Sequence, residues 1–154
     1  MSKKIAVIGL GNPLRGDDGI GTIILTSLLS DYKRDHIDYL DFGSASFDLI
    51  NRLKNYELCL IIDAISAGLF PGELKIFCLH EAVFENSEGI ISTHELSLKD
   101  IFELSKKFDI KTKIYVAGVQ IKEVGFGKPL CLDLKNKLND LTLEIDRFIG
   151  EKLK

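Results

Sequence analysis

The sequence lacks an apolar run long enough to cross a membrane. The run near the N-terminus covers only Ile5–Leu10, which is too short to span a bilayer or to form the core of a signal peptide. We therefore expect a cytoplasmic protein without membrane insertion. Internal repeats, linkers and low-complexity stretches are also missing, and 154 residues are about one domain. We expect a single domain over residues 1–154.

The sequence is also poor in cysteine and in excess charge. Its three cysteines, Cys59, Cys78 and Cys131, are an odd number, lie far apart and fall within apolar patterns. This favours reduced, buried thiols over a disulfide framework or a zinc knuckle. The formal net charge is −3, and the lysines are scattered instead of grouped into a stripe. A nucleic-acid partner is therefore not expected.

The composition suits a globular α/β protein. Hydrophobic residues make up 45 % and charged residues 28 % of the chain, so a core can form without disulfides or a structural metal. Short apolar segments alternate with segments whose apolar residues have helical spacing. This predicts an α/β fold with a mostly parallel five-stranded sheet. In chain order we expect strand 4–10, helix 20–29, strand 37–41, a short helix capped by Ser46, strand 58–62, strand 73–79, a helix begun by a Ser97 and Asp100 capping box, strand 114–120 and a long last helix from Leu130.

One strand is expected to run against the others. Only ten residues, 63–72, separate the third strand from the fourth, whereas a parallel crossover needs about a dozen or more. The fourth strand is therefore predicted to be antiparallel, and the helix after Ser97 then returns the chain to the starting edge. The third strand is the most apolar, so it is expected to be central and to end at Asp63.

Two adjacent acids, Asp17 and Asp18, follow the first strand and three glycines. The plainest interpretation makes one of them the N-cap of the next helix. A phosphate loop is a second possibility, because Gly11 and Gly16 have the spacing of a P-loop. However, no lysine follows the last glycine, and two carboxylates repel phosphate. A dinucleotide fingerprint fails as well, because Leu14 stands where its third glycine belongs.

Paired acids at the end of a strand are better suited to bind a cation than an anion such as phosphate. Ligands of open α/β sheets bind beyond the carboxyl ends of the parallel strands. Asp17 and Asp18 follow the first strand, and Asp63 lies at the end of the third, so one carboxylate from each strand is expected to project into a shared cleft as an exposed side chain. His94 reaches the same place if the segment before it returns to that edge.

Two carboxylates and an imidazole from three separate loops can form a three-ligand cation site with open coordination positions. This mixture of oxygen and nitrogen suits nickel or zinc better than calcium, and the spacing alone does not choose between them. His36 and His80 have no acidic residues grouped around them, so we expect both at the surface.

Three motifs together strongly resemble the hydrogenase maturation endopeptidases, which process the large subunit of nickel-iron hydrogenases. They are Gly9-Leu10-Gly11-Asn12-Pro13-Leu14-Arg15-Gly16-Asp17-Asp18-Gly19-Ile20-Gly21, then Ile62-Asp63-Ala64, then Ser92-Thr93-His94. The likeness covers essentially the whole chain in length and element order. It implies a three-layer α/β/α sandwich and an endopeptidase that removes a C-terminal peptide from the hydrogenase precursor after nickel insertion.

The resemblance also implies the roles of individual residues. Asp18, Asp63 and His94 occupy the positions of the family's metal ligands and catalytic residues, and Asp17 matches a neighbouring acidic position. The metal would be nickel already bound by the precursor's cysteines, with zinc or cadmium as surrogates, so that only a nickel-loaded precursor binds strongly. Gly43 matches a glycine turn beside the cleft.

In such a site the metal would polarise the scissile carbonyl or lower the pKa of an attacking water, with Asp18 or Asp63 as the general base. Covalent catalysis is not expected, because no serine or cysteine stands in a nucleophile motif. Two other classes of function stay open. One is a non-catalytic, nickel-dependent hydrogenase assembly chaperone that holds the precursor with the same three ligands. The other is a nucleotide-binding α/β domain, in which phosphate would lie against the paired acids.

Overall fold

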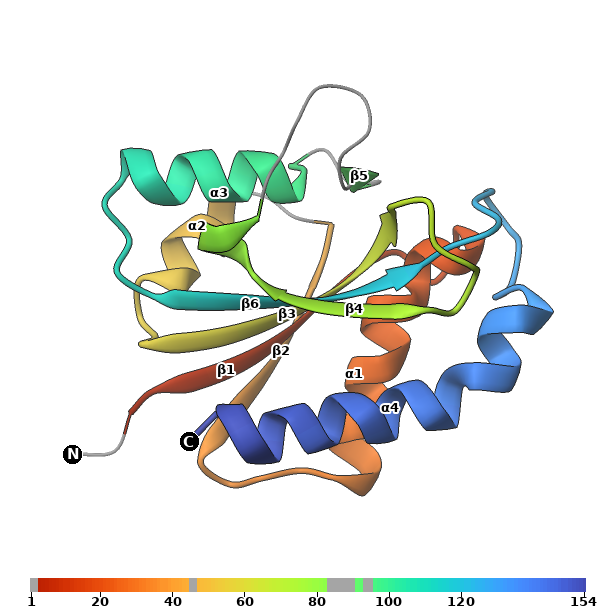
Figure 1. Cartoon of the computed structure of the whole chain (residues 1–154), viewed down its shortest axis with the longest axis horizontal. Helices are drawn as coiled ribbons and strands as arrows, with labels where there is room; N and C mark the ends of the chain where they lie inside the picture. Colours follow the sequence, from red (N-terminus) through yellow and green to blue (C-terminus); the bar gives the residue numbers. More distant parts are fainter. Residues whose placement is uncertain (1–2, 45–46, 83–90, 93–95) are drawn as a thin grey trace.

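The computed structural model describes residues 3–44, 47–82, 91–92 and 96–154. Its sheet has five main strands in the order β2-β1-β3-β6-β4, and a short strand, β5, pairs with β3 outside this order. Neighbours among β2, β1, β3 and β6 are parallel, and β4 is antiparallel to β6 (Figure 1). The strands are β1 (Ile5–Leu10), β2 (Ile37–Gly43), β3 (Leu58–Ser66), β4 (Leu74–Cys78), β5 (Ile91–Ser92) and β6 (Lys113–Gln120). The predicted mostly parallel sheet with one antiparallel strand is confirmed.

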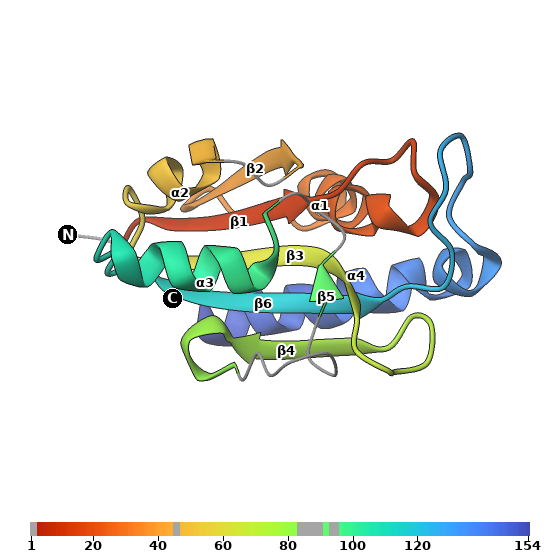
Figure 2. The ribbon, with the colours of Figure 1, turned by 90° about the horizontal axis from the view of Figure 1, so that it is seen from above.

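Helices cover both faces of this sheet. α1 (Ile20–Asp31) and α4 (Leu132–Lys152) lie on one face, and α2 (Phe47–Leu53) and α3 (Leu98–Lys107) lie on the other (Figures 1 and 2). Two separate clusters of buried apolar side chains fill the spaces between the sheet and the helices. The α/β/α sandwich that the resemblance implied is confirmed.

The central strands are buried throughout. Every residue of β1 and every residue of β3 except Ser66 is buried, as expected for parallel strands covered on both faces. Burial raises the pKa of the Cys59 thiol to about 12, because an apolar site disfavours the thiolate. All three cysteines are free, but Cys78 and Cys131 are only half-buried. The expectation of full burial therefore holds for Cys59 alone.

The end of β3 differs from the prediction. The strand does not stop at Asp63 but continues to Ser66, because residues 63–65 pair with the last three residues of β6. An acid is unfavourable in most strands, which is why the sequence pattern placed the boundary too early. Asp63 therefore lies within a strand, where its backbone is held on one side by β6.

The helix starts were predicted with mixed success. The capping box of Ser97 and Asp100 is present, with the Ser97 side chain accepting from the Asp100 N–H and the Asp100 carboxylate accepting from the Ser97 N–H. The proposed N-cap role of Asp17 or Asp18 is wrong, because the N-cap of α1 is Gly19, and no side chain caps it. The predicted cap Ser46 lies outside the described residues.

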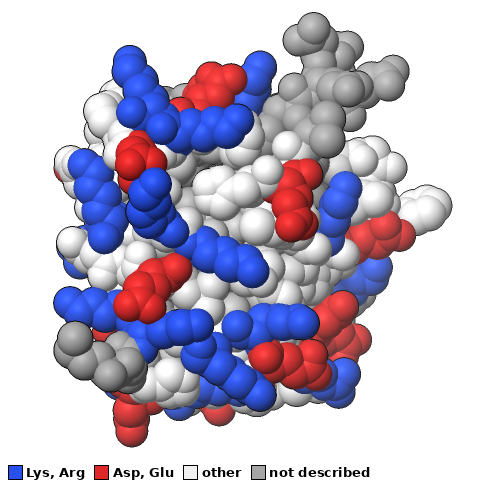
Figure 3. Space-filling view, turned by 60° about the vertical axis from the view of Figure 1, so that its left-hand side comes forward, with Lys and Arg blue, Asp and Glu red and all other residues white. Residues whose placement is uncertain are grey.

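The surface carries both signs of charge. Basic and acidic side chains are interspersed over the face seen in Figure 3. His36 and His80 are exposed, as predicted. Within residues 3–44, 47–82, 91–92 and 96–154, no helix is both long enough and apolar enough to cross a membrane.

Candidate functional site

The turn between β1 and α1 is folded tightly around Asp18. This residue lies in a short 3-10 helix, η1 (Gly16–Gly19), and is 1 % exposed. Its carboxylate oxygen Oδ2 accepts a hydrogen bond from the Asn12 backbone N–H at 3.1 Å. Gly11 has a φ of 141°, and a Cβ built on it would collide with the Asp18 carbonyl oxygen. Only glycine allows the backbone to approach Asp18 in this conformation.

Asp63 comes to the same edge of the sheet from β3. Its neighbour Ile62 pairs with Gly9 of β1, and Asp63 itself pairs with Gly118 of β6. Asp63 is 0 % exposed, so the expectation that both acids are exposed in a cleft is wrong. η1 and the first turn of α1 pack on β3 next to this residue.

Gly21 holds the two acid-bearing segments together. A Cβ built on Gly21 would collide with the carbonyl oxygens of both Leu10 and Ile62. The first turn of α1 therefore packs directly on the main chain at the end of β1 and in the middle of β3, and η1 contacts β3. Asp18 precedes Gly21 by three residues, and Asp63 follows Ile62 directly. The structure thus brings Asp18 and Asp63 to one junction.

This close packing predicts an unusual effect of Gly21→Ala. In a helix the change ordinarily stabilises by roughly 0.5–1 kcal/mol, but here the added methyl group overpacks the junction, which costs about 1–3 kcal/mol. We expect the free energy of unfolding, measured by urea titration, to fall. Gly150→Ala in α4 is the matched control, because the added Cβ there meets only the end of the Arg34 side chain. Equal stability of Gly21→Ala and the wild type would contradict this account.

The third predicted ligand, His94, lies outside the described residues. The described residues that precede it in the sequence form β5, where Ser92 pairs with Ile65 and Ile91 pairs with Ser66 of β3. Ser92 precedes His94 by two residues, and Ile65 follows Asp63 by two. Among the described residues, no three His, Cys, Asp or Glu side chains group together as a metal site. The described part of the site therefore consists of the two acids.

Asp17 has a different environment from Asp18. Its side chain is fully buried and accepts hydrogen bonds from the backbone N–H groups of Lys122, Glu123 and Cys131. Burial alone would raise the pKa of Asp17, but these three hydrogen bonds outweigh it and hold the pKa below its ordinary value. The three donors belong to the segment between β6 and α4, and sequence reasoning missed them because a backbone N–H carries no sequence signal.

The turn after β2 lies against the same loop. The Gly43 carbonyl oxygen accepts a hydrogen bond from the Gly11 N–H at 2.7 Å. The Asp41 carboxylate accepts from the Gly43 N–H at 2.9 Å and from the Thr22 hydroxyl at 3.3 Å. Gly43 has a φ of 55°, which glycine adopts without strain. The structure therefore places Gly43 beside the loop that carries Asp18.

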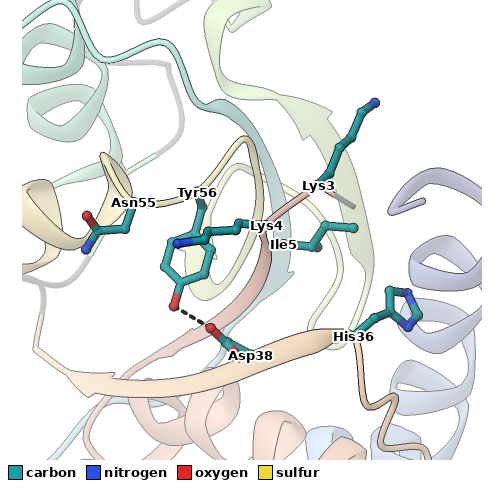
Figure 4. Close-up of a pocket in the computed structure, with 7 residues that line it drawn as sticks. All are labelled: Lys3, Lys4, Ile5, His36, Asp38, Asn55 and Tyr56. Atoms are coloured by element: carbon teal, nitrogen blue, oxygen red, sulfur yellow. Dashed lines mark hydrogen bonds between the residues drawn. The ribbon is translucent and has the colours of Figure 1, made fainter. Parts of the chain in front are cut away.

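A hollow at the opposite end of the strands does not belong to this site. It has a volume of about 250 Å³ and is lined by Lys3, Lys4, Ile5, His36, Asp38, Asn55 and Tyr56 (Figure 4). The Tyr56 hydroxyl donates to the Asp38 carboxylate at 2.8 Å. Burial raises the pKa of Tyr56, and the hydrogen bond to Asp38 adds to this effect. The acids of the candidate site lie at the carboxyl ends of the strands instead.

Comparison with known proteins relates this arrangement to one family. The model of the hydrogenase maturation proteases matches residues 24–146. The hydrogenase 2 maturation protease of Escherichia coli K12 is 36 % identical over 121 residues, which cover 75 % of this chain and 72 % of that protein. A putative hydrogenase maturation protease of Methanocaldococcus jannaschii is 28 % identical over 157 residues, which cover 93 % of this chain and 88 % of that protein.

Solved structures show the same fold. The hydrogenase maturating endopeptidase HybD of Escherichia coli superposes with a TM-score of 0.80 at 26 % identity, covering 96 % of this chain and 93 % of that one. The maturation protease HycI of Thermococcus kodakarensis gives a TM-score of 0.77 at 24 % identity, covering 97 % and 94 %. The sequence match and the shared fold agree, and the chain belongs to the hydrogenase maturation protease family.

Proposed function

We propose that this protein is an endopeptidase that removes the C-terminal extension of a nickel-iron hydrogenase large-subunit precursor after nickel insertion. Asp18, Asp63 and His94 would bind the nickel that the precursor carries and would act as the catalytic residues. The family supports the processing of a hydrogenase protein. The nickel recognition and the three residue roles are our proposal.

The observation that carries the proposal is the junction of two buried carboxylates. Asp18 follows β1 in η1, Asp63 lies within the neighbouring parallel strand β3, and Gly21 packs closely on the main chain of both strands. A carboxylate in a low-dielectric environment attracts a cation more strongly than one in water. The carboxyl end of a parallel sheet is also where α/β proteins bind their ligands. Both features favour a cation at this edge.

The pairing of β5 supports the inclusion of His94. Ser92 is fixed beside Ile65 at the same end of β3. His94 follows Ser92 by two residues in the sequence. An imidazole added to two carboxylates gives a mixed oxygen and nitrogen ligand set, which nickel accepts readily.

The proposed chemistry divides between the metal and the chain. Nickel supplies Lewis acidity, which activates a carbonyl or a water molecule. Asp18, Asp63 and His94 orient the precursor by binding the ion that it carries. One of the two carboxylates accepts the proton of the attacking water as general base. No residue of this scheme forms a covalent bond to the substrate.

Mass spectrometry of the nickel-loaded precursor before and after incubation with the protein tests this function. We expect the precursor to become shorter by its C-terminal extension, and the released peptide to appear in the same spectrum. A stable complex with an uncut precursor would instead indicate the assembly chaperone. If a nucleotide competes with the precursor for the protein, a nucleotide-binding domain is indicated. We expect no such competition, because the two carboxylates repel phosphate.

A further inference from the structure

Asp17 joins the candidate site to the segment between β6 and α4. Its Oδ2 atom accepts from the N–H groups of Lys122 at 2.9 Å and Glu123 at 2.8 Å, and its Oδ1 atom accepts from the N–H group of Cys131 at 2.7 Å. A carboxylate offers about four acceptor positions, and three of them here hold backbone donors. The side chain is 0 % exposed. Asp17 is therefore bonded at both oxygens by a part of the chain more than 100 residues away.

Backbone hydrogen bonds join the same two segments in other places. The Asp17 N–H donates to the Glu123 carbonyl at 2.9 Å, and the Gly16 N–H donates to the Lys128 carbonyl at 2.9 Å. The Gly127 N–H donates to the Leu14 carbonyl at 2.7 Å. Figure 2 shows the two segments side by side at one end of the sheet. The Asp17 carboxylate lies at the buried centre of this connection.

The position of Asp17 in the chain gives the connection a consequence for the site. Asp18 is the next residue, and both belong to η1. A shift of Asp17 would therefore move the backbone that carries the Asp18 carboxylate. A displacement of about 1 Å at a catalytic group can lower a rate about 100-fold. The three bonds to Asp17 thus restrict a movement to which the site is sensitive.

We propose that Asp17 is a positioning residue, not a metal ligand, and that its hydrogen bonds to Lys122, Glu123 and Cys131 hold Asp18 in place to bind the precursor's nickel. This proposal rests on the proposed function, because its effect is expressed through Asp18. It separates the two adjacent acids of the motif by role: one contacts the metal, and the other orients its neighbour through the main chain.

The first test is a double-mutant cycle on binding of the nickel-loaded precursor. Asp17→Asn replaces one acceptor oxygen by an NH₂ group that faces a backbone donor. We expect the dissociation constant to rise by about tenfold, as for other residues that orient a metal ligand. In the Asp18→Asn background the same change should have no further effect, because the residue that it positions has already lost its charge. Equal losses in the two backgrounds would contradict the proposal.

A second test removes the Cys131 N–H and thiol, both of which bond to Asp17, and leaves the carboxylate in place. Cys131 has a φ of −63°, which proline adopts, so Cys131→Pro deletes the N–H donor with little change in the backbone. We expect precursor binding to weaken several-fold. Leu132→Pro is the matched control: it places proline at the first position of α4, where proline is favoured, and keeps the Cys131 N–H. Binding should then equal that of the wild type.

The outcomes distinguish this proposal from the function on which it rests. If the wild type neither binds nor shortens the nickel-loaded precursor, the proposed function is wrong. If the wild type does both and Asp17→Asn and Cys131→Pro match it, only the positioning role is wrong. Circular dichroism and thermal unfolding establish that each variant is folded at the assay temperature. If Asp17→Asn does not fold, Cys131→Pro and Leu132→Pro decide the question.

Discussion

Asp18→Asn, Asp63→Asn and His94→Ala should each abolish removal of the precursor's C-terminal extension, with a loss of about 1,000-fold or more. Under the proposed function, each change removes one ligand from the ion that activates the reacting groups. Such an ion contributes several kcal/mol to the transition state, and every 1.36 kcal/mol corresponds to about tenfold in rate. Initial rates from mass spectrometry of the nickel-loaded precursor measure the loss.

The fold should survive these changes, and this separates a loss of chemistry from a loss of structure. Asparagine has the shape of aspartate, so Asp18→Asn and Asp63→Asn leave no cavity in their buried surroundings. The wild-type circular dichroism spectrum and an intact cooperative transition are expected for all three variants. Asp140→Asn, at an exposed position of α4, is the control and should cleave at the wild-type rate. If Asp18→Asn, Asp63→Asn or His94→Ala also cleaves at the wild-type rate, the residue changed has no part in the mechanism.

The precursor without nickel should be cut at least about 100 times more slowly than the nickel-loaded precursor. Under the proposed function, the three ligands contribute to binding only when the substrate presents a metal, so the difference in affinity provides the selection. A factor of 100 corresponds to about 2.7 kcal/mol, which is modest for three coordination bonds. Time courses with the two forms of the precursor, at equal concentration, give the ratio.

Two controls make this measurement decisive. Addition of nickel to the metal-free precursor should restore cleavage to the extent that the metal enters the precursor. Addition of nickel to the protein alone, followed by removal of free metal, should not restore cleavage of the metal-free precursor, because under the proposed function the ion belongs to the substrate. Equal cleavage of both precursor forms would exclude nickel recognition and leave only the peptidase activity.

Much of the fold follows from the sequence because burial leaves a pattern. The apolar runs of β1 and β3 predict strands covered on both faces, and the short connection after Asp63 predicts that β4 runs antiparallel. The end of β3 and the presence of β5 did not follow. Both depend on pairing between distant segments, and β5 is only two residues long, too short to show any periodicity.

The candidate site was predictable to a smaller extent. The sequence predicts that Asp18 and Asp63 follow neighbouring strands; the structure places Asp63 within β3 instead, but beside the same strand β1 that precedes Asp18. Their burial was not foreseen, because it results from the glycines of the turn and from Gly21, whose contacts are with main-chain atoms. The environment of Asp17 was not foreseen either, because its partners are backbone N–H groups. Sequence patterns report side chains, whereas this site is built largely by the main chain.

The close approach at Gly21 also matters for protein engineering. The spacing of the two acid-bearing segments depends in part on contact between a helix and two carbonyl groups. Any side chain at position 21 would widen this spacing, whatever its chemical character. Redesign of the protein therefore has to keep glycine there, even where a larger residue would favour the helix.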